Sequence, residues 1–542
     1  MDKKVKIGFN IIAIVSIVMF CIALTPITLQ NDTFYTIKIG EHILENGIDM
    51  HDPFSIHNLP YTYPHWLYDV GIYLIFNFSG MLGVYISTII LCCILGIIIY
   101  ITNKKIVKND LTSFLLTLGV MYVLSNFIAA RAQLVTYILF TLQILFIEKF
   151  ISTKKIRYAL GLIVIPIIIA NVHLAVWPFY FIPFLPYVAE YIIALLLDSH
   201  LIFKIDSKII EMRINRLSNK EKREKLELIK KEKLKKFENY KEKQIKRRDN
   251  PYKIKIVRND NVKWLILIMI ICTLTGLLTP LGDAPYTYLI KTMQGNTTKS
   301  INEHLPMVLI ESTYTLAIIA ITLSILIFTD TKIRLKDFFM LGGLILLALM
   351  SRRQLSMLAL LGVYSINILV KDFFNKYDPN GTEQFIKIIT SGFGRIITLL
   401  LVILVCIVIY KPKVNDEYIN LKSYPVEAAK YIKENLNLED IRLYNEYNYG
   451  SYLLYEGIPV FIDSRADLYT PEFNGDKNKD IFSDFIKTSS LSMHYEELFT
   501  KYDITHIIIP NNSKMSVFIT KDDNYKELYK DSNFAVYERL NK

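Results

Sequence analysis

The hydrophobic residues of this 542-residue chain gather in long blocks that carry almost no charge. Most blocks hold roughly 17–22 residues, enough for a helix to cross a hydrocarbon core ~30 Å thick at ~1.5 Å per residue. They cover residues 6–26, 82–102, 111–128, 134–149, 157–172, 174–196, 263–281, 312–329, 337–350, 355–370 and 393–410. The pattern predicts an all-α polytopic membrane domain of about 11 transmembrane helices within residues 1–410.

Polar and aromatic residues fill two long loops between the blocks, 27–81 and 280–311. In the first loop, residues 34–46 have helical spacing. Residues 66–78 indicate an amphipathic helix that lies along the membrane interface, with Trp66 at the level of the headgroups. We therefore expect helical structure in the first loop outside the bilayer.

The last stretch, residues 411–542, alternates helix-like and strand-like patterns. Pro425 opens a predicted helix that ends at Leu436. Short apolar runs bounded by turn residues predict strands over 460–462, 504–509 and 534–537. These patterns predict a small α/β domain.

Lysine and arginine favour the short loops on one side of the predicted membrane domain. That side holds Lys104, Lys105, Lys108, Lys149, Lys154, Lys155, Arg157, Lys332, Arg334, Lys336, Lys371, Lys376, Lys387 and Arg395. The positive-inside rule makes it cytoplasmic, together with the N-terminus. No small-residue cleavage site follows the first block, so we expect it to remain as a span. An odd number of spans places the C-terminal domain outside the cytoplasm of a multi-pass cell-membrane protein.

Residues 197–262 look like a basic cytoplasmic helical insertion. Between Lys204 and Arg258 there are 21 Lys and Arg against 9 Asp and Glu, a net charge of +12 in a chain whose total is +11. The run 207–248 predicts one or two charged helices. Such helices are usually solvated, and the alternative is a cationic surface that contacts anionic lipid headgroups. Nucleic-acid binding is not expected, because the loop is tethered to a membrane and has few aromatic residues.

The cysteines and histidines do not predict a metal centre. All five cysteines (Cys21, Cys92, Cys93, Cys272 and Cys406) lie inside apolar blocks, so a disulfide framework is not expected. Histidines gather in the outer loops, but none has the spacing of a zinc site. We expect no firm cofactor and regard a divalent metal as unfavoured.

Several short motifs resemble those of bacterial and archaeal polytopic proteins related to the GT-C superfamily of lipid-phosphosugar-dependent glycosyltransferases. They are Asp32 after the first block, Asp52-Pro-Phe-Ser, Pro64-His65-Trp66-Leu67 with Asp69, Arg131-Ala-Gln133-Leu, Asn171-Val-His173, Glu303 in Ile-x-Glu-x-x-Pro, Tyr444-Asn-Glu-Tyr-Asn-Tyr-Gly450 and Asp463-Ser-Arg465-Ala-Asp467. The resemblance covers most of the chain except residues 200–260. It implies a GT-C-like fold and a polyprenyl-phosphate sugar as donor substrate. Many of these enzymes carry paired acids where this chain has Asn31-Asp32, which disfavours a metal-centred mechanism.

Moving a sugar from a polyprenyl phosphate requires a base for the acceptor hydroxyl. Asp32, at the outer mouth of the first span, is the predicted general base, and Asp52 is the reserve. The structural alternative for Asp32 is an interfacial or helix-capping acid. For Asp52 it is an Asp-Pro turn.

The departing phosphate needs positive charge, which arginine supplies in a suitable planar geometry. Two predicted outer turns carry similar strings, Arg131-Ala-Gln133-Leu and Arg352-Arg353-Gln-Leu. We expect Arg131 and one of Arg352 and Arg353 to face a shared cavity and contact the phosphate of the donor. Snorkelling to headgroups is the alternative.

Further polar residues at the outer ends of the spans are candidate substrate contacts. They are His65, Asn171, His173, Glu303 and His304, and the alternative for the histidines is a hydrogen-bonded interfacial role. Asp463, Arg465 and Asp467 alternate at a predicted strand end, where we expect them to dock the C-terminal domain onto the membrane domain.

The sequence thus favours an inverting membrane glycosyltransferase acting on an envelope acceptor at the outer face. Two alternatives stay open: a transporter or flippase of a lipid-linked or polar solute, and a non-catalytic scaffold of envelope assembly. Transporters usually show repeated halves with broken spans, and only the two Arg-x-Gln-Leu turns repeat here. The bias toward Lys, Ile and Asn is typical of an AT-rich bacterial genome.

Overall fold

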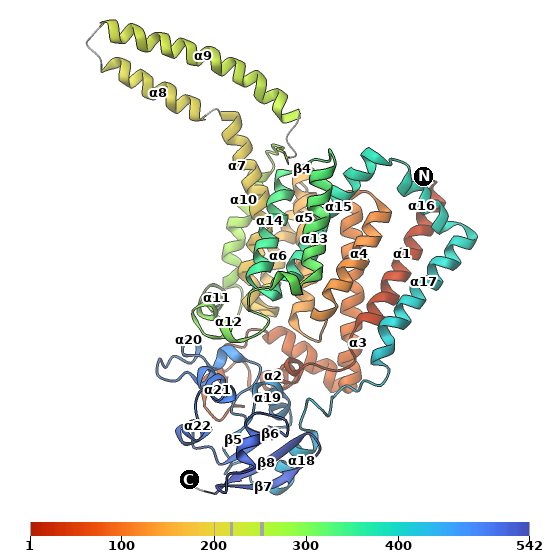
Figure 1. The fold of residues 1–542 in the computed structure, drawn as a ribbon, viewed down its shortest axis with the longest axis vertical. Helices are drawn as coiled ribbons and strands as arrows, with labels where there is room; N and C mark the ends of the chain where they lie inside the picture. Colours follow the sequence, from red (N-terminus) through yellow and green to blue (C-terminus); the bar gives the residue numbers. More distant parts are fainter. Residues whose placement is uncertain (1, 200, 217–219, 250–253, 541–542) are drawn as a thin grey trace.

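The apolar blocks are all helical in the computed structural model of the protein, which describes residues 2–199, 201–216, 220–249 and 254–540 (Figure 1). The helices over them are α1 (Lys3–Leu24), α3 (Trp66–Val107), α4 (Asp110–Leu124), α5 (Ala132–Thr153), α6 (Ile156–Val172), α7 (Leu185–Ser199), α10 (Val262–Thr273), α13 (Thr313–Phe328), α14 (Leu335–Met350), α15 (Leu355–Tyr377) and α17 (Gly392–Tyr410). Within the described residues, seven helical segments are long and apolar enough to cross a membrane. A mostly helical membrane protein is therefore confirmed, and the number of about 11 spans stays a prediction.

Helix α3 contains both the predicted interfacial helix and the second span. Its backbone breaks at Gly80, where φ is 60° and ψ is −155°. Glycine tolerates this positive φ because it has no Cβ. The chain thus turns at Gly80 from the first loop into the span.

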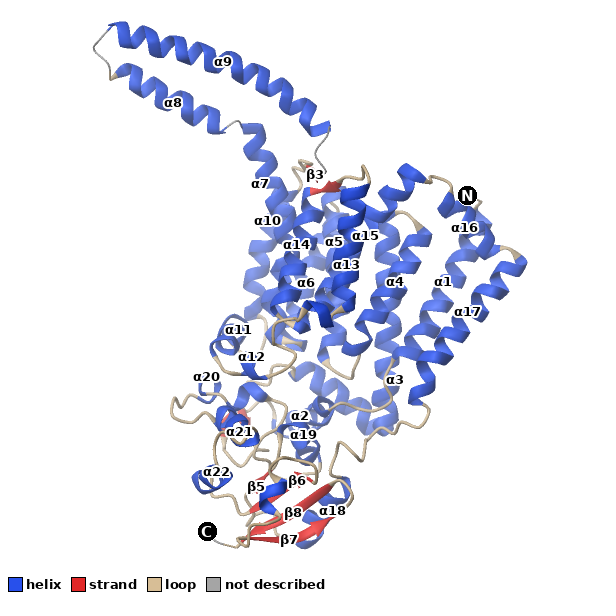
Figure 2. Ribbon diagram, viewed as in Figure 1, coloured by secondary structure: helices blue, strands red, loops and turns tan. Residues whose placement is uncertain are grey.

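The two ends of the helical bundle differ in what they carry (Figures 1 and 2). The N-terminus lies at one end, together with a hairpin of α8 (Leu201–Asn215) and α9 (Lys220–Asp249). The first loop, with α2 (Asn31–Asn46), lies at the other end beside α11 (Ala284–Gln294), α12 (Thr297–Ser300) and residues 411–540. The two long loops and the C-terminal region therefore share one end of the bundle, and the predicted sidedness stays a prediction.

Residues 411–540 fold into a four-stranded sheet with helices around it (Figure 2). The strand order is β5-β6-β8-β7, with β5 (Leu443–Tyr444) parallel to β6 (His506–Pro510), and with β8 (Phe534–Arg539) antiparallel to both β6 and β7 (Tyr525–Lys530). The predicted helix is α18 (Val426–Asn435). The predicted strand 460–462 is wrong, because Val460 makes only an isolated bridge to Ser55 of the first loop.

The core of this C-terminal region is continuous with that of the first loop. One cluster of buried side chains joins Phe34 and Tyr63 to Tyr452, Phe461 and Ile508. The Phe34 ring lies 4.9 Å from that of Tyr424 and 5.2 Å from that of Tyr452. Apolar burial therefore holds the first loop against the C-terminal region. This contact fixes the first loop at that end of the bundle.

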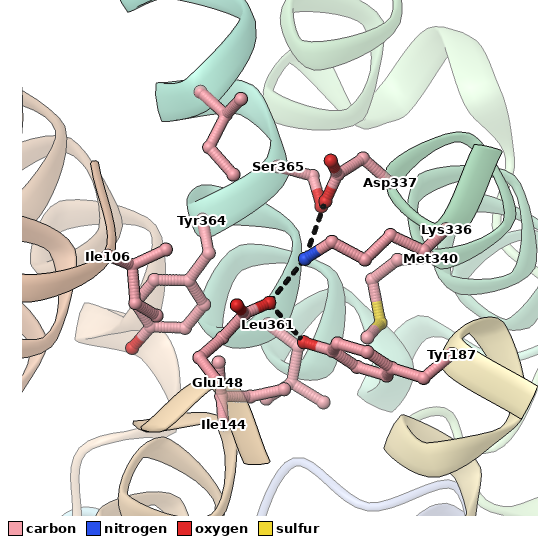
Figure 3. A pocket seen from close by; sticks show the side chains of 11 residues that line it. Ile106, Ile144, Glu148, Tyr187, Lys336, Asp337, Met340, Leu361, Tyr364 and Ser365 are labelled. Carbon is pink, nitrogen blue, oxygen red and sulfur yellow. Dashed lines mark hydrogen bonds and ion pairs between the residues drawn. The ribbon is translucent and has the colours of Figure 1, made fainter. Parts of the chain in front are cut away.

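A buried ionic cluster lies at the start of α14 (Figure 3). Lys336 pairs with Glu148 of α5 and lies 3.6 Å from Asp337, while the Tyr187 hydroxyl donates to Glu148 at 2.8 Å. Ser365 of α15 donates to Asp337 at 3.0 Å. The space between these side chains is about 10 Å³, room for a single water at most. We interpret the cluster as an anchor for α14, whose other end leads into the 3-10 helix η5 (Arg352–Gln354).

Candidate active site: a chamber between the bundle and the C-terminal region

A cavity of about 1080 Å³ lies where the helical bundle meets the C-terminal region. Its walls come from α2, the start of α5, the 3-10 helix η2 (Leu174–Phe184), α11, η5, the start of α19 (Tyr447–Tyr455), the 3-10 helix η7 (Ala466–Tyr469) and α21 (Ile481–Ser489). Segments more than 400 residues apart in the sequence therefore share one surface. A cavity of this size accommodates a drug-sized or larger ligand.

Most of the polar residues singled out from the sequence line this chamber. They are Asp32, His65, Arg131, Gln133, His173, Glu303, His304, Arg353, Arg465 and Asp467. Four others do not line it: Asp52, Asn171, Arg352 and Asp463. The fold thus brings the outer turns and the first loop together, as expected, but separates neighbours such as Arg352 and Arg353.

Arg131 connects the acids of two different loops. Its guanidinium lies 2.5 Å from the carboxylate of Asp32, in the first turn of α2, and 3.9 Å from that of Glu303. Arg131 itself is the N-cap residue of α5. Asp32 is therefore held in place by a charge partner at the chamber wall.

The backbone brings Arg353 next to Glu303. The Arg353 N–H donates to the Glu303 carbonyl at 2.9 Å, and the Arg352 N–H donates to the Leu305 carbonyl at 3.0 Å. The Ser351 hydroxyl also donates to the Glu303 carbonyl, at 3.2 Å. These bonds fasten the loop at 301–305 to η5, so that one acid and one arginine line the chamber from adjacent segments.

Three histidines, His65, His173 and His304, line the chamber. The rings of His65 and His173 lie 4.9 Å apart, and His173 Nδ1 is 3.0 Å from the Thr136 hydroxyl. Burial, with the nearby charge of Arg131, lowers the pKa of His65 to about 4. Burial, with Arg353 nearby, also lowers the pKa of His304 to about 4. Both imidazoles are therefore uncharged near neutral pH.

Arg465 docks the C-terminal region onto the first loop. Its guanidinium is buried, 2.7 Å from Asp52 and 2.6 Å from Asp463, and lies over the rings of Tyr61 and Phe54 at 4.9 and 5.5 Å. The Asp52 carboxylate also accepts from the backbone N–H groups of Phe54 and Ser55, as in an Asp-Pro turn. Asp52 thus pairs with Arg465 between the first loop and the C-terminal region. Asp32 remains the candidate for the general base.

Asp467 docks the same region onto the second outer loop. Its carboxylate accepts hydrogen bonds from the hydroxyls of Thr292 and Thr297, each at 3.0 Å. Burial raises the pKa of Asp467. The expected strand end at 463–467 is wrong, because Arg465 instead precedes the 3-10 helix η7, which lets Arg465 and Asp467 reach different loops.

Asn171 has a structural environment outside the chamber. Its side-chain oxygen accepts from the Trp66 indole N–H at 3.2 Å, and its amide donates to the carbonyls of Ile167 and Leu278. These bonds join the start of α3 to the end of α6. We infer that Asn171 orders this corner.

Sequence reasoning missed an acid on the chamber wall, Glu446. It is the N-cap residue of α19 and lines the chamber beside Tyr447 and Asn448. Burial raises the pKa of Glu446 to about 7. The acid lies inside the Tyr444–Gly450 motif, but only the packing of α19 against α2 brings it to the chamber.

Apolar side chains of the bundle also line the chamber. They are Phe140, Val176, Phe179, Met350 and Met357. No cluster of three or more His, Cys, Asp or Glu placed to hold a metal occurs in the part of the chain that the structure describes. The expectation that a divalent metal is unfavoured stays a prediction.

Comparison with known proteins decides the fold. No family model and no curated protein matches the chain. Among solved structures, the oligosaccharyltransferase of Archaeoglobus fulgidus tethered to an acceptor peptide matches 93% of this chain and 69% of its own length, at 9% identity and a TM-score of 0.50. The oligosaccharyltransferase AglB from Archaeoglobus fulgidus, in complex with an inhibitory peptide and a dolichol-phosphate, matches 94% of this chain and 70% of its own length, at 12% identity and a TM-score of 0.52. The chain shares the fold of these oligosaccharyltransferases. The likeness spans both the helical bundle and the C-terminal region, and at this identity it establishes the fold alone.

Proposed function

We propose that this protein is an inverting membrane glycosyltransferase that moves a sugar from a polyprenyl-phosphate donor to an envelope acceptor. The observation that carries the proposal is the single chamber lined by Asp32, Arg131, Glu303 and Arg353. It combines two carboxylates, two arginines and apolar side chains from the bundle. These are the features that a lipid-linked phosphosugar requires.

In the proposed reaction, the acceptor oxygen attacks the anomeric carbon from the face opposite the phosphate. The bond between that carbon and the phosphate oxygen breaks, and its electron pair leaves with the phosphate. Asp32 takes the proton of the acceptor hydroxyl. Arg131 holds Asp32 at 2.5 Å, and Arg131 and Arg353 together supply positive charge to the departing phosphate.

The GT-C fold supports the choice of a lipid-linked donor. One archaeal oligosaccharyltransferase structure with this fold contains a dolichol-phosphate, and the other a tethered acceptor peptide. The lipid tail of a donor would contact the apolar wall at Phe140, Phe179 and Met357. The acceptor would then approach from the wall of the C-terminal region.

The decisive assay supplies purified protein with radiolabelled polyprenyl-phosphate sugars and a cell-envelope extract. Transfer of label to an acceptor is expected. Flux of a solute into proteoliposomes without any transfer would instead identify a transporter. Failure of both assays, with the donor still bound, would favour a non-catalytic scaffold.

Replacing Arg131 with alanine is expected to weaken donor binding by about tenfold or more, because a charge-assisted hydrogen bond to phosphate contributes ~1.5–3 kcal/mol. Binding of a polyprenyl phosphate to the purified protein measures this. Arg395→Ala is a matched control, since Arg395 lies at the start of α17, far from the chamber. Unchanged donor affinity in Arg131→Ala would show that Arg131 does not bind the donor phosphate.

Raising the pH through about 7 is expected to weaken donor binding, because Glu446 is neutral below this pH and negative above it. A negative charge across the chamber from a phosphate disfavours binding by about threefold to tenfold at an effective dielectric constant of ~20 or more. The donor phosphate titrates as well. The same pH series on Glu446→Gln therefore isolates the part of the change in donor affinity that comes from Glu446. Identical pH profiles for the two proteins would contradict the prediction.

A further inference from the structure

The basic insertion forms a helical hairpin that projects from the end of the bundle opposite the C-terminal region (Figure 1). Helix α8 follows the apolar helix α7, and α9 runs back toward residues 254–255, which pair with residues 333–334. The Lys230 ammonium of α9 lies 3.0 Å from the Glu211 carboxylate of α8. In Figure 1, α8 is the helix nearer the bundle, with α9 on its far side.

Helix α8 has two apolar faces. Ile210 and Ile214 are buried, at 7% and 6% exposure, whereas Ile205, Ile209 and Met212 are 50%, 39% and 48% exposed. At about 100° per residue, the exposed three form one stripe on the side of the helix opposite the buried pair. Because the hairpin buries only the face with Ile210 and Ile214, the second face is left uncovered.

Basic residues flank the uncovered stripe. Lys208 and Arg213 are exposed and lie about 70° to either side of its centre line at the helical angle per residue, and the exposed Arg216 follows the last residue of α8. An apolar stripe bordered by lysine and arginine is typical of helices that lie in a membrane interface, with the stripe among the acyl chains and the cations among anionic headgroups. Helix α9 also exposes Leu228, Ile229 and Leu234, but at about 100° per residue these point to different sides, whereas the exposed apolar side chains of α8 share one side.

We propose that α8 lies on the bilayer surface beside the bundle and binds anionic lipid through this stripe and its flanking cations. Helix α7 delivers α8 to the bilayer surface at the end of the bundle, so no further partner is needed to bring the surfaces together. Helix α9 covers the other face of α8 and turns its own charges to solvent. The apolar stripe distinguishes a bilayer from a nucleic acid, which would be bound by charge without buried apolar side chains.

The test measures amide hydrogen exchange of full-length protein in nanodiscs of zwitterionic phosphatidylcholine, with and without phosphatidylglycerol. Exchange in residues 201–216 is expected to slow by at least about fivefold in the anionic discs, the effect of roughly one basic residue near such a surface. The double variant Lys208→Glu/Arg213→Glu is expected to abolish the difference, and Ile209→Ser/Met212→Ser to reduce it. The matched control Arg223→Glu/Lys225→Glu makes the same charge change on α9 and is expected to retain it.

Equal exchange in both lipid mixtures would overturn the proposal and leave α8 a solvated helix. Protection by a soluble polyanion, without an effect of phosphatidylglycerol, would also overturn it and point to another partner. Neither outcome depends on sugar transfer, because the hairpin lies at the opposite end of the bundle from the chamber.

Discussion

Replacing Asp32 with asparagine is expected to slow sugar transfer by about 10²–10⁴-fold, the usual effect of removing a general base. Asparagine keeps the shape of the side chain but cannot accept the acceptor's proton. It also removes a negative charge beside Arg131, which lies 2.5 Å away. Affinity for the anionic donor is therefore expected to stay the same or rise while the transfer rate falls.

A rate assay and a donor-binding assay on the same preparation separate the chemistry from a general defect. Asp523→Asn, at an exposed position of the C-terminal region, is the matched control and is expected to transfer sugar normally. Asp32→Glu is expected to retain part of the activity, because it keeps a carboxylate. Full transfer by Asp32→Asn would show that another residue of the chamber is the general base. Glu303 and Glu446 would then be tested next.

Replacing Arg465 with alanine is expected to destabilise the protein by about 3–5 kcal/mol, because it leaves buried carboxylates without their cation. The carboxylates of Asp52 and Asp463 lie 2.7 and 2.6 Å from the guanidinium, and both side chains are fully buried. The first loop and the C-terminal region share this cluster. We therefore expect earlier thermal unfolding and faster proteolysis at residues 51–61.

The exposed pair of Lys433 and Glu456 in the same region provides the comparison. Lys433→Ala is expected to change stability by less than about 1 kcal/mol, as is usual for surface ion pairs. Thermal unfolding of both variants in detergent measures the contrast. Equal, small shifts would show that Arg465 contributes little to docking, whereas adding Asp52→Asn to Arg465→Ala is expected to recover part of the loss.

Much of the chamber could be predicted because its residues are polar side chains at the ends of apolar blocks. Asp32, Arg131, His173 and Glu303 each follow or precede such a block on the predicted outer side. Charged groups at that depth require partners, so these side chains were expected to lie close to one another. Their mutual distances were not predictable, since they depend on how the helices pack.

Adjacent residues with the same chemistry could not be told apart. Arg352 and Arg353 both sit in a single 3-10 turn, where successive side chains point about 120° apart, so the packing of α14 decides which one reaches the chamber. Asp52 and Asp32 were likewise two candidates for one role. The burial of Arg465 beside Asp52 assigns Asp52 to docking.

The sequence by itself determined that this is a many-helix membrane protein with polar loops, a basic insertion and a strand-containing C-terminal region. Hydrophobic length, charge bias and helical spacing are local properties, and they survive in any packing of the chain. Only the tertiary structure decided that Glu446 faces Asp32's chamber, that Arg465 reaches the first loop, and that α8 keeps one apolar face uncovered. Those facts depend on contacts between segments distant in the chain, which no local pattern encodes.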